Sequence, residues 1–233
     1  MLGSPFVRAI PVISLAVASS LGAGAAHADP EDLNTDAFDL SGALDRDVAP
    51  THRALEVAIG GGYTQGVGGA GTAGSVEDLT GPGGGIELQL GLRATPQWSI
   101  ALYGTVARFR HGDDIADGSR AHSTTAGVQA VWHSRAARSL DPWVSIGAGW
   151  RGLWLSPRGA ESTSVHGLEL ARIQLGIDYR FTPWFAIAPV VGASATLFVV
   201  EDAAMATSLS AVHDNRLNLY GFTGILGRFD VGG

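Results

Sequence analysis

Apolar and polar residues alternate along this chain with a period of two, most clearly at 86–93, which reads IELQLGLR. Its aliphatic residues share one parity, and the other parity holds Glu87, Gln89, Gly91 and Arg93. Successive side chains of a β-strand point to opposite faces, so this segment is predicted to be a strand with one apolar and one polar face. A soluble sandwich shows the same alternation, so the number and spacing of such segments must distinguish the folds.

Eight segments have the pattern and length of strands. They are Arg53–Gln65, Gly85–Ala94, Trp98–Arg110, Thr124–His133, Pro142–Leu155, Leu168–Phe181, Trp184–Val200 and Leu217–Phe229. About ten residues are enough for a tilted strand to cross a bilayer. The chain therefore has the strands needed for a small transmembrane barrel.

The connections between these segments alternate in length. Those at 95–97, 134–141 and 182–183 are short, whereas those at 66–84, 111–123, 156–167 and 201–216 are long and polar or glycine-rich. Outer-membrane barrels place short turns on the periplasmic side and long loops outside. With a periplasmic N-terminus, the rhythm matches that arrangement, and a sandwich has no reason to sort its loops this way.

The composition suits an exported β protein. The 233 residues are 45% hydrophobic and 16% charged and include 33 Gly, which is too apolar for disorder and too rich in glycine for an average helical domain. The net charge is -7 without any basic run, so no nucleic-acid partner is expected. Cysteine is absent, as suits passage through an oxidising compartment.

Three regions are predicted along the chain. Residues 1–28 have the features of a signal peptide, because Arg8 precedes a mostly apolar stretch that ends in a small-x-small site at 26–28. Residues 29–52 are acidic and lack sustained alternation, which predicts a periplasmic N-terminal segment. Residues 53–233 are predicted to form the barrel.

Proline and tryptophan mark the short turns, in ATPQW at 94–98, LDPW at 140–143 and FTPW at 181–184. Tryptophan favours the headgroup level of a membrane, where its ring is half buried and its N–H stays hydrated. A periplasmic aromatic girdle is therefore predicted, made of Trp98, Trp132, Trp143, Tyr179, Phe181 and Trp184, with Phe229 beside it. The opposite rim is predicted to hold Tyr63, Phe109, Trp150, Trp154 and Phe198. A soluble barrel with these rings in its core is the alternative.

Three segments are harder to interpret. The apolar segment 185–200 is long enough for a membrane-spanning helix. However, Pro189 and the content of β-branched residues favour a strand that bulges at the proline. At 168–181, Leu168 and Leu170 share a parity with Arg172, which predicts a bulge or a strand that projects beyond the lipid. The segment 217–229 is apolar on both faces and cannot be oriented.

From Arg53 onward the chain resembles the small eight-stranded outer-membrane barrels of the OmpA, OmpX and OmpW type. The resemblance is carried by IELQLGLRATPQWSIALYG, by QLGIDYRFTPWFAIAP and by the rhythm of loop lengths. It implies an all-β, eight-stranded antiparallel up-and-down transmembrane β-barrel in the bacterial outer membrane. It also implies a monomer whose partners are outer-membrane lipid, lipopolysaccharide and the barrel-assembly machinery. The chain departs from the pattern at its end, because Phe229 is followed by DVGG where such barrels usually finish on an aromatic residue.

An eight-stranded barrel has an interior that side chains can fill. By parity, the predicted polar network of the lumen is Glu56, Glu87, Gln89, Arg93, Gln129, Arg151, Gln174, Asp178 and Arg180. Enclosed charges of opposite sign are expected to pair. The network is thus either a structural plug or the lining of a narrow channel, and a wide pore is excluded by the strand number.

No catalytic, cofactor or metal site is predicted. A lipid-A acylase or deacylase would need Ser, His and an acid together, and the candidates are His122-Ser123 with Glu169 or His166. Neighbours in a strand point apart, so His122 and Ser123 form no such site. The acidic run at 111–118 resembles a calcium loop, but Ile115 stands where an oxygen ligand is needed. The expected role is therefore structural, surface-interacting or solute-related, with a channel or a lipid-modifying enzyme as the alternatives.

Overall fold

The computed structural model describes residues 46–50, 53–68, 76, 80–111, 120–156, 162–203, 210–211 and 217–232. The predicted signal peptide at 1–28 lies outside these residues, as do 29–45, 51 and 52 of the predicted acidic segment and most of the calcium-like run at 111–118. No helix in the described part has the length and hydropathy to cross a membrane.

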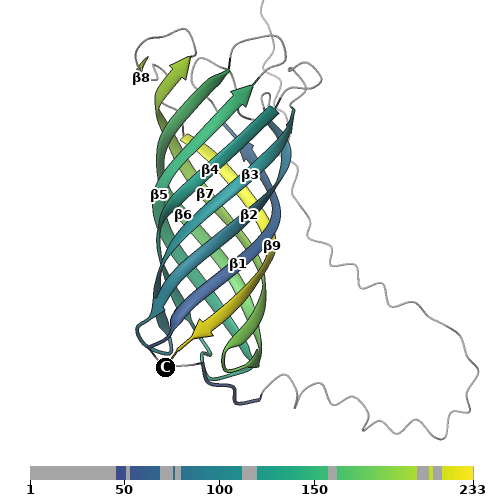
Figure 1. Cartoon of the computed structure of the whole chain (residues 1–233), viewed down its shortest axis with the longest axis vertical. Coiled ribbons are helices and arrows are strands. Elements are labelled where there is room, and N and C mark those ends of the chain that lie inside the picture. Colours follow the sequence, from purple (N-terminus) through teal and green to yellow (C-terminus); the bar gives the residue numbers. More distant parts are fainter. Residues whose placement is uncertain are drawn as a thin grey trace, which may run out of the picture. The chain divides into compact units, whose positions relative to one another are not determined.

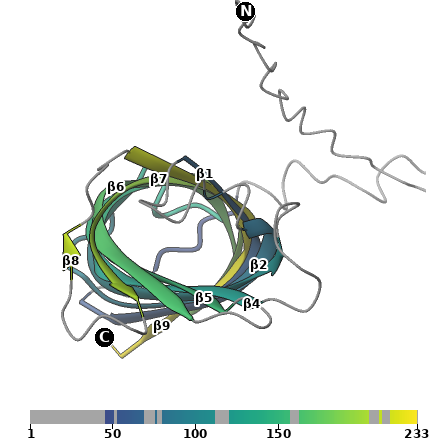
Figure 2. The ribbon, with the colours of Figure 1, turned by 90° about the horizontal axis from the view of Figure 1, so that it is seen from above.

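The described residues form one closed ring of strands. The strands are β1 (Leu55–Val67), β2 (Thr80–Arg93), β3 (Trp98–His111), β4 (Arg120–His133), β5 (Leu140–Ser156), β6 (Thr163–Thr182), β7 (Phe185–Ala203), β8 (Ser210–Ala211) and β9 (Leu217–Val231). β1 to β7 pair in chain order, and β9 pairs with both β7 and β1 to close the ring, all antiparallel (Figures 1 and 2). β8 is a two-residue strand that pairs only with β7. The predicted eight-stranded antiparallel barrel is confirmed.

The two ends of the barrel differ in their connections. The connections 94–97, 134–139 and 183–184 lie with the C-terminus at one end, called here the turn end (Figure 1). The connections 68–79, 112–119, 157–162 and 204–216 join the strands at the other end, called the loop end. Several strands continue further toward the loop end than expected, since 80–84, 120–123 and 163–167 are strand. Ladder hydrogen bonds need only backbone, so glycine and polar residues extend a strand beyond its apolar pattern.

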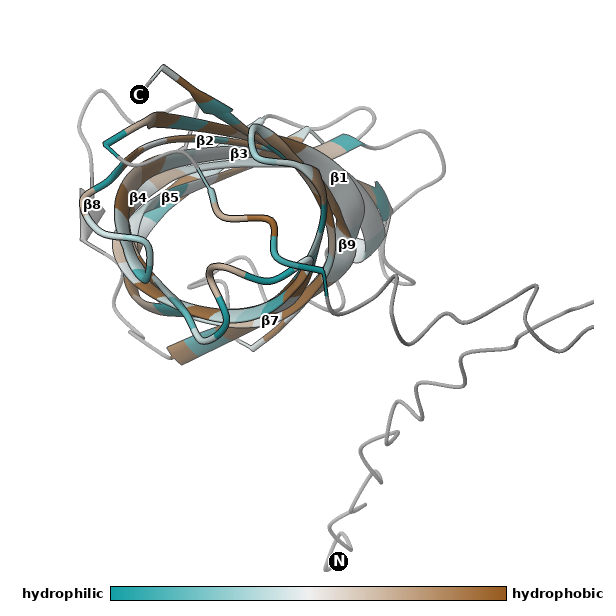
Figure 3. Cartoon of the chain, turned by 90° about the horizontal axis from the view of Figure 1, so that it is seen from below, coloured by the Kyte–Doolittle hydropathy of each residue, from teal (hydrophilic) through white to brown (hydrophobic). Residues whose placement is uncertain are grey.

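The outer face of the barrel is apolar. Every one of the eight long strands exposes large hydrophobic side chains, among them Ile86 at 65%, Ile100 at 65% and Ile146 at 63%. Buried Glu, Asp and Arg side chains lie on the inward face. Figure 3, which looks into the turn end, shows hydrophilic and hydrophobic residues alternating along the strands. This is the reverse of a water-soluble barrel, in which the apolar face is enclosed.

A bulge in β6 reverses its facing. Arg172 pairs with Gly147 of β5, whereas Glu169 pairs with Gly149, so Leu170 and Ala171 together oppose one residue. Inward residues are therefore even-numbered from Arg172 toward the turn end and odd-numbered from Glu169 toward the loop end. The predicted bulge is confirmed, and it turns Leu168 and Leu170 outward. The bulge predicted at Pro189 is wrong: Pro189 faces outward and pairs with Ile225 of β9 in unbroken register.

Residues 46–50 lie along the turn between β4 and β5. The Val48 N–H donates to the carbonyl of Ala137, and the Ser139 N–H donates to the carbonyl of Arg46, both at 2.9 Å. An ion pair of 3.3 Å joins Arg138 to Asp47. This part of the predicted acidic segment is thus attached to the turn end.

Candidate functional site

All nine residues predicted to line the lumen point into the barrel. Eight of them are 5% exposed or less, and the Glu87 side chain is 12% exposed. Gln129 is buried without a hydrogen-bond partner for its amide among the described residues. The other eight fall into two groups, one at the turn end and one at mid-height.

Six charged side chains form a closed ring at the turn end, called here the ion ring. Its members are Glu56 of β1, Arg93 of β2, Asp178 and Arg180 of β6, and Arg228 and Asp230 of β9. Each acid contacts two arginines, and each arginine contacts two acids. Three positive and three negative charges therefore cancel inside the barrel.

The contacts of the ion ring join neighbouring strands at Glu56 and strands separated by β7 at Asp178 and Asp230. Arg93 Nη2 lies 2.7 Å from Glu56 Oε2, and Arg228 Nη1 bonds the other oxygen of the same carboxylate. Arg180 Nη1 of β6 lies 2.8 Å from Asp230 of β9, across the intervening β7. Arg228 Nε lies 3.2 Å from Asp178. The ring thus ties β1, β2, β6 and β9 together through the lumen.

Two of the arginines also hold turns. Arg93 Nη1 donates to the carbonyl of Pro96 at 3.0 Å, and Arg180 Nη1 donates to the carbonyl of Pro183 at 3.4 Å. Both belong to the same local sequence, RATP at 93–96 and RFTP at 180–183. This repeated Arg-x-Thr-Pro pattern is the signal that could have identified the pair from the sequence.

Trp143 does not belong to the aromatic girdle, which corrects the prediction. It is 3% exposed inside the barrel, where its indole N–H donates to Asp178 at 2.7 Å. The Arg228 guanidinium lies 5.0 Å from its ring centroid. The physical reason is parity, since Trp143 lies on the same face of β5 as Asp141 and Arg151. Pro142 beside it was predicted to lie in the turn, but it pairs with Ile177 within β5, and its presence said nothing about the facing of Trp143.

The other predicted girdle residues do face outward at the turn end. Trp98 is 51%, Trp132 is 42%, Phe181 is 47% and Trp184 is 56% exposed, and Tyr179 is half-buried on the same face. Trp98 and Trp132 are direct partners across β3 and β4. Tyr179, Phe181, Phe185 and Phe229 continue the band through successive ring contacts of 4.7 to 5.7 Å.

A second polar group, called here the mid-lumen cluster, lies above the ion ring. It contains Glu87, Gln89, Tyr103, Arg151, Glu169, Arg172 and Gln174. Arg172 pairs with Glu87, Arg151 Nη2 lies 2.8 Å from Glu169, and the Tyr103 hydroxyl donates to Glu169. The side-chain amide of Gln174 donates to Glu87 at 3.0 Å. Two acids and two arginines are again balanced.

Aromatic rings cover both arginines of this cluster. The Arg172 guanidinium lies 4.6 Å from the centroids of Tyr103 and Phe222, and that of Arg151 lies 3.9 Å from Tyr220. A ring face attracts a cation most strongly where water is excluded. The arginines are therefore held by both charge and ring contacts.

A cavity lies beside the mid-lumen cluster. Glu87, Arg151, Arg172 and Phe222 contribute to its lining, and glycines of β1, β2 and β9 form part of the wall. Those strands approach closely: a Cβ on Gly62 would overlap the carbonyl oxygen of Thr223. Glycine permits this close approach of the strands, and it contributes no side chain to the wall of the cavity.

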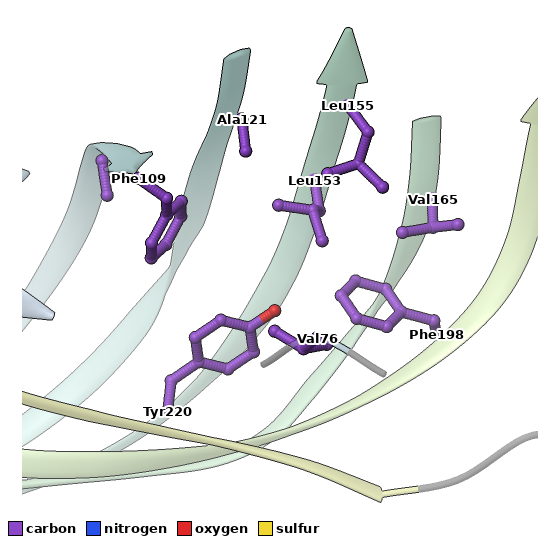
Figure 4. Close-up of a cluster of buried hydrophobic side chains, with 9 residues drawn as sticks. Val76, Phe109, Ala121, Leu153, Leu155, Val165, Phe198 and Tyr220 are labelled. Carbon is purple, nitrogen blue, oxygen red and sulfur yellow. The ribbon is translucent and has the colours of Figure 1, made fainter. Parts of the chain in front are cut away.

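The loop end of the lumen is apolar, which the sequence prediction missed. Nine side chains pack there, namely Val76, Ala107, Phe109, Ala121, Leu153, Leu155, Val165, Phe198 and Tyr220 (Figure 4). Val76 comes from the connection between β1 and β2 and is fully buried. Phe109 and Phe198 were predicted at the outer rim of the wall, but both point inward. From turn end to loop end, the lumen therefore passes from ion ring to mid-lumen cluster to apolar layer.

The predicted catalytic candidates do not assemble. Ser123 is buried inside while His122 is exposed outside, and Glu169 is inside the mid-lumen cluster. His166 Nε2 does lie 3.2 Å from Ser164 Oγ on the outer face. His166 packs against Trp150 and Trp154, and among the described side chains no carboxylate bonds its ring.

One group of side chains has the composition of a metal site, namely His133, Asp141 and Asp178. Three of its four carboxylate oxygens accept from protein donors: those of Asp141 from His133 at 2.7 Å and from the Arg135 N–H, and Asp178 Oδ1 from Trp143. Arg228 and Arg180 also contact Asp178. Two adjacent guanidinium groups already neutralise Asp178 and oppose a cation there.

Known structures resemble this chain in fold but share little of its sequence. No protein-family model and no curated protein matches the chain. Neisserial surface protein A matches with a TM-score of 0.51 and 12% identity, over 76% of this chain and 96% of its own. The outer membrane protein OprG of Pseudomonas aeruginosa matches with a TM-score of 0.43 and 11% identity, over 78% of this chain and 100% of its own. The attachment invasion locus protein Ail of Yersinia pestis matches with a TM-score of 0.41 and 16% identity, over 77% of this chain and 100% of its own. This chain has the closed antiparallel fold of the small eight-stranded outer-membrane β-barrels.

Proposed function

We propose that this chain is an integral outer-membrane β-barrel whose lumen is plugged, with a structural or surface-presenting role and no catalytic one. The observation that carries the proposal is the reversed polarity of the barrel. Large apolar side chains are exposed on every long strand, while charged rings and pairs are enclosed. A bilayer favours this arrangement, because lipid chains contact the apolar wall. The closed sheet also leaves no backbone group unpaired in lipid.

The height of the apolar wall supports this environment. On β3, Arg108, where outward-facing charge begins, lies ten positions after Trp98 in the girdle. At about 3.3 Å per residue and a tilt of about 40°, that segment rises by roughly 25 Å. This is the height of the apolar band on outer-membrane barrels.

Export and orientation follow as parts of the proposal. Residues 1–28 would direct the chain across the inner membrane, and the barrel-assembly machinery would insert it as a monomer. The turn end would then face the periplasm, with residues 46–50 attached to it, and the loop end would face outward. Outer-membrane lipid and lipopolysaccharide would surround the wall.

Cell fractionation tests the location. The chain is expected in the outer-membrane fraction, and its gel mobility should change on boiling because a closed barrel resists detergent until heated. Removing residues 1–28 should leave it in the cytoplasm, which serves as the matched control. A product that stays soluble, with the same mobility before and after boiling, would contradict the proposal.

A narrow channel is the second candidate, favoured by the cavity beside Glu87 and by the partial exposure of that side chain. The ion ring below and the apolar layer above oppose it, because a passing ion would have to replace paired charges and then cross an uncharged layer.

Planar-bilayer recording decides between the two. The plugged barrel is expected to give no conductance steps, and both Glu87→Ala and Arg93→Ala should remain silent because each removes one side chain from one layer only. A channel would instead conduct as the natural chain, with steps that change in size in one of these variants. Reproducible steps of that kind would replace the plug with the channel.

A further inference from the structure

We propose that a basic and aromatic patch on the outer wall binds the phosphate group of a phosphorylated lipid in the surrounding leaflet. The wall patch is made of Arg108, Arg110, Arg120, His122 and Trp154, at the loop end of β3, β4 and β5. The inference rests on the proposed membrane setting and adds a specific lipid site to it.

The strand register places these residues next to one another. Arg108 is the partner of His122, and His122 is the partner of Trp154. Arg110 and Arg120 stand two residues along the same strands, toward the loop end, on the same face. Paired residues on one face lie about 5 Å apart and residues two apart about 7 Å, so one headgroup can reach all of them.

The facing of the wall patch is unambiguous. Arg108, Arg110, Arg120 and His122 are all exposed, whereas their chain neighbours, Ala107, Phe109, Ala121 and Ser123, are buried in the lumen. The His122 ring stacks on that of Trp154, with centroids 5.1 Å apart and planes within 5°. The stack holds a donor-bearing ring beside Arg108.

These arginines differ from the five inside the barrel. Arg93, Arg151, Arg172, Arg180 and Arg228 each pair with at least one carboxylate. No carboxylate among the described residues pairs with Arg108, Arg110 or Arg120. Outward-facing cations at the edge of a lipid layer need an anion to offset their partial desolvation.

Along its own ladder row, the charge of the wall patch ends at β3. The ladder row that contains Arg108 continues in the other direction through Gly84, Tyr63 and Thr223, none of which is charged. The adjacent cations on β3 and β4 offer several hydrogen-bond donors to one anionic group.

The chemistry of the wall patch favours phosphate on a lipid. Guanidinium groups form paired hydrogen bonds with phosphate oxygens, and tryptophan favours the headgroup level. Directly toward the turn end, Val106 is 55% and Leu102 is 61% exposed, which gives acyl chains an apolar wall. A single molecule with phosphate above and hydrocarbon below matches both parts.

Lipid retention by the refolded chain in neutral detergent tests the proposal. Lipid A is the probe, phosphatidylcholine is the neutral lipid, and native mass spectrometry counts retained molecules. Arg108→Gln with Arg120→Gln is expected to weaken lipid A retention by about tenfold or more, since two charge-assisted contacts are lost. The matched control is Arg53→Gln with Arg135→Gln, which removes two exposed arginines near the turn end and should leave retention unchanged.

Three outcomes would overturn the proposal: equal retention of lipid A by both double variants, equal retention of phosphatidylcholine and lipid A by the natural chain, or full displacement of lipid A by millimolar inorganic phosphate. The last would show a site for free phosphate. The assay uses refolded chain in micelles, so its result does not depend on where the chain is located in the cell. Failure of the cell-fractionation test and failure of the lipid-retention test can therefore be told apart.

Discussion

Replacing Glu56 by glutamine is expected to lower the free energy of unfolding of the refolded barrel by about 3–5 kcal/mol. Glu56 is 1% exposed and bonds Arg93 and Arg228 through separate oxygens. Without its charge, two buried guanidinium groups lose their shared anion and the ion ring carries a net positive charge. Urea titration in phospholipid vesicles, followed by tryptophan fluorescence, measures the loss.

The control for this prediction is a double-mutant cycle with Arg228→Gln. Each single variant leaves the ion ring with unbalanced charge, whereas the double variant removes one acid and one base together. The double variant should therefore cost less than the sum of the singles, by about 0.5–3 kcal/mol. Strictly additive costs would show that the pair contributes no coupling, and the ring would then be only a packing feature.

The ion ring also explains why the turn end and the lumen are one structural unit. Arg93 and Arg180 reach from the carboxylates of the ring to the proline carbonyls of two turns. A change in ring charge therefore acts on the connections as well as on the strands. We expect the turn end to loosen first in Glu56→Gln, because Arg93, which also holds the Pro96 carbonyl, loses its closest carboxylate.

Sequence alternation was enough to predict the ring of strands and most of its polar interior. Where one parity is apolar and the other polar, as at 86–93, facing follows directly, and the nine predicted lumen residues all point inward. The pattern fails where a local feature changes the parity. The bulge at Leu170 and Ala171 reverses the parity of β6, so Glu169 was not predicted to line the lumen.

Other wrong predictions concern residues that suit both the lumen and the outward wall of the barrel. In β9 the inward face includes Tyr220, Phe222 and Leu226, so Arg228 and Asp230 were not recognised beside them. Tryptophan is equally ambiguous: Trp98 lies in the outward band and Trp143 in the lumen, although each closely follows a proline. The N–H of a tryptophan ring needs a polar partner, which can be water at the membrane surface or a buried carboxylate in the lumen. Only the strand register shows which of the two it meets.

Leu102→Arg is expected to cost about 2–4 kcal/mol in a bilayer, because a charge on the lipid face is most unfavourable near the midplane. Leu102 is 61% exposed and lies four residues above Trp98 and six below Arg108, near the middle of the apolar wall. Urea titration in phospholipid vesicles measures the cost.

The matched control is Thr124→Arg, an exposed position in the row just below the wall patch, where the cost should fall to about 0–1 kcal/mol. The difference between the two variants isolates depth in lipid, since both place the same charge on the same outward face. If the barrel were surrounded by water, Leu102→Arg would remove an exposed apolar side chain and both changes would be small and equal. A cost that depends on depth can arise only if hydrocarbon surrounds the wall between the girdle and the wall patch.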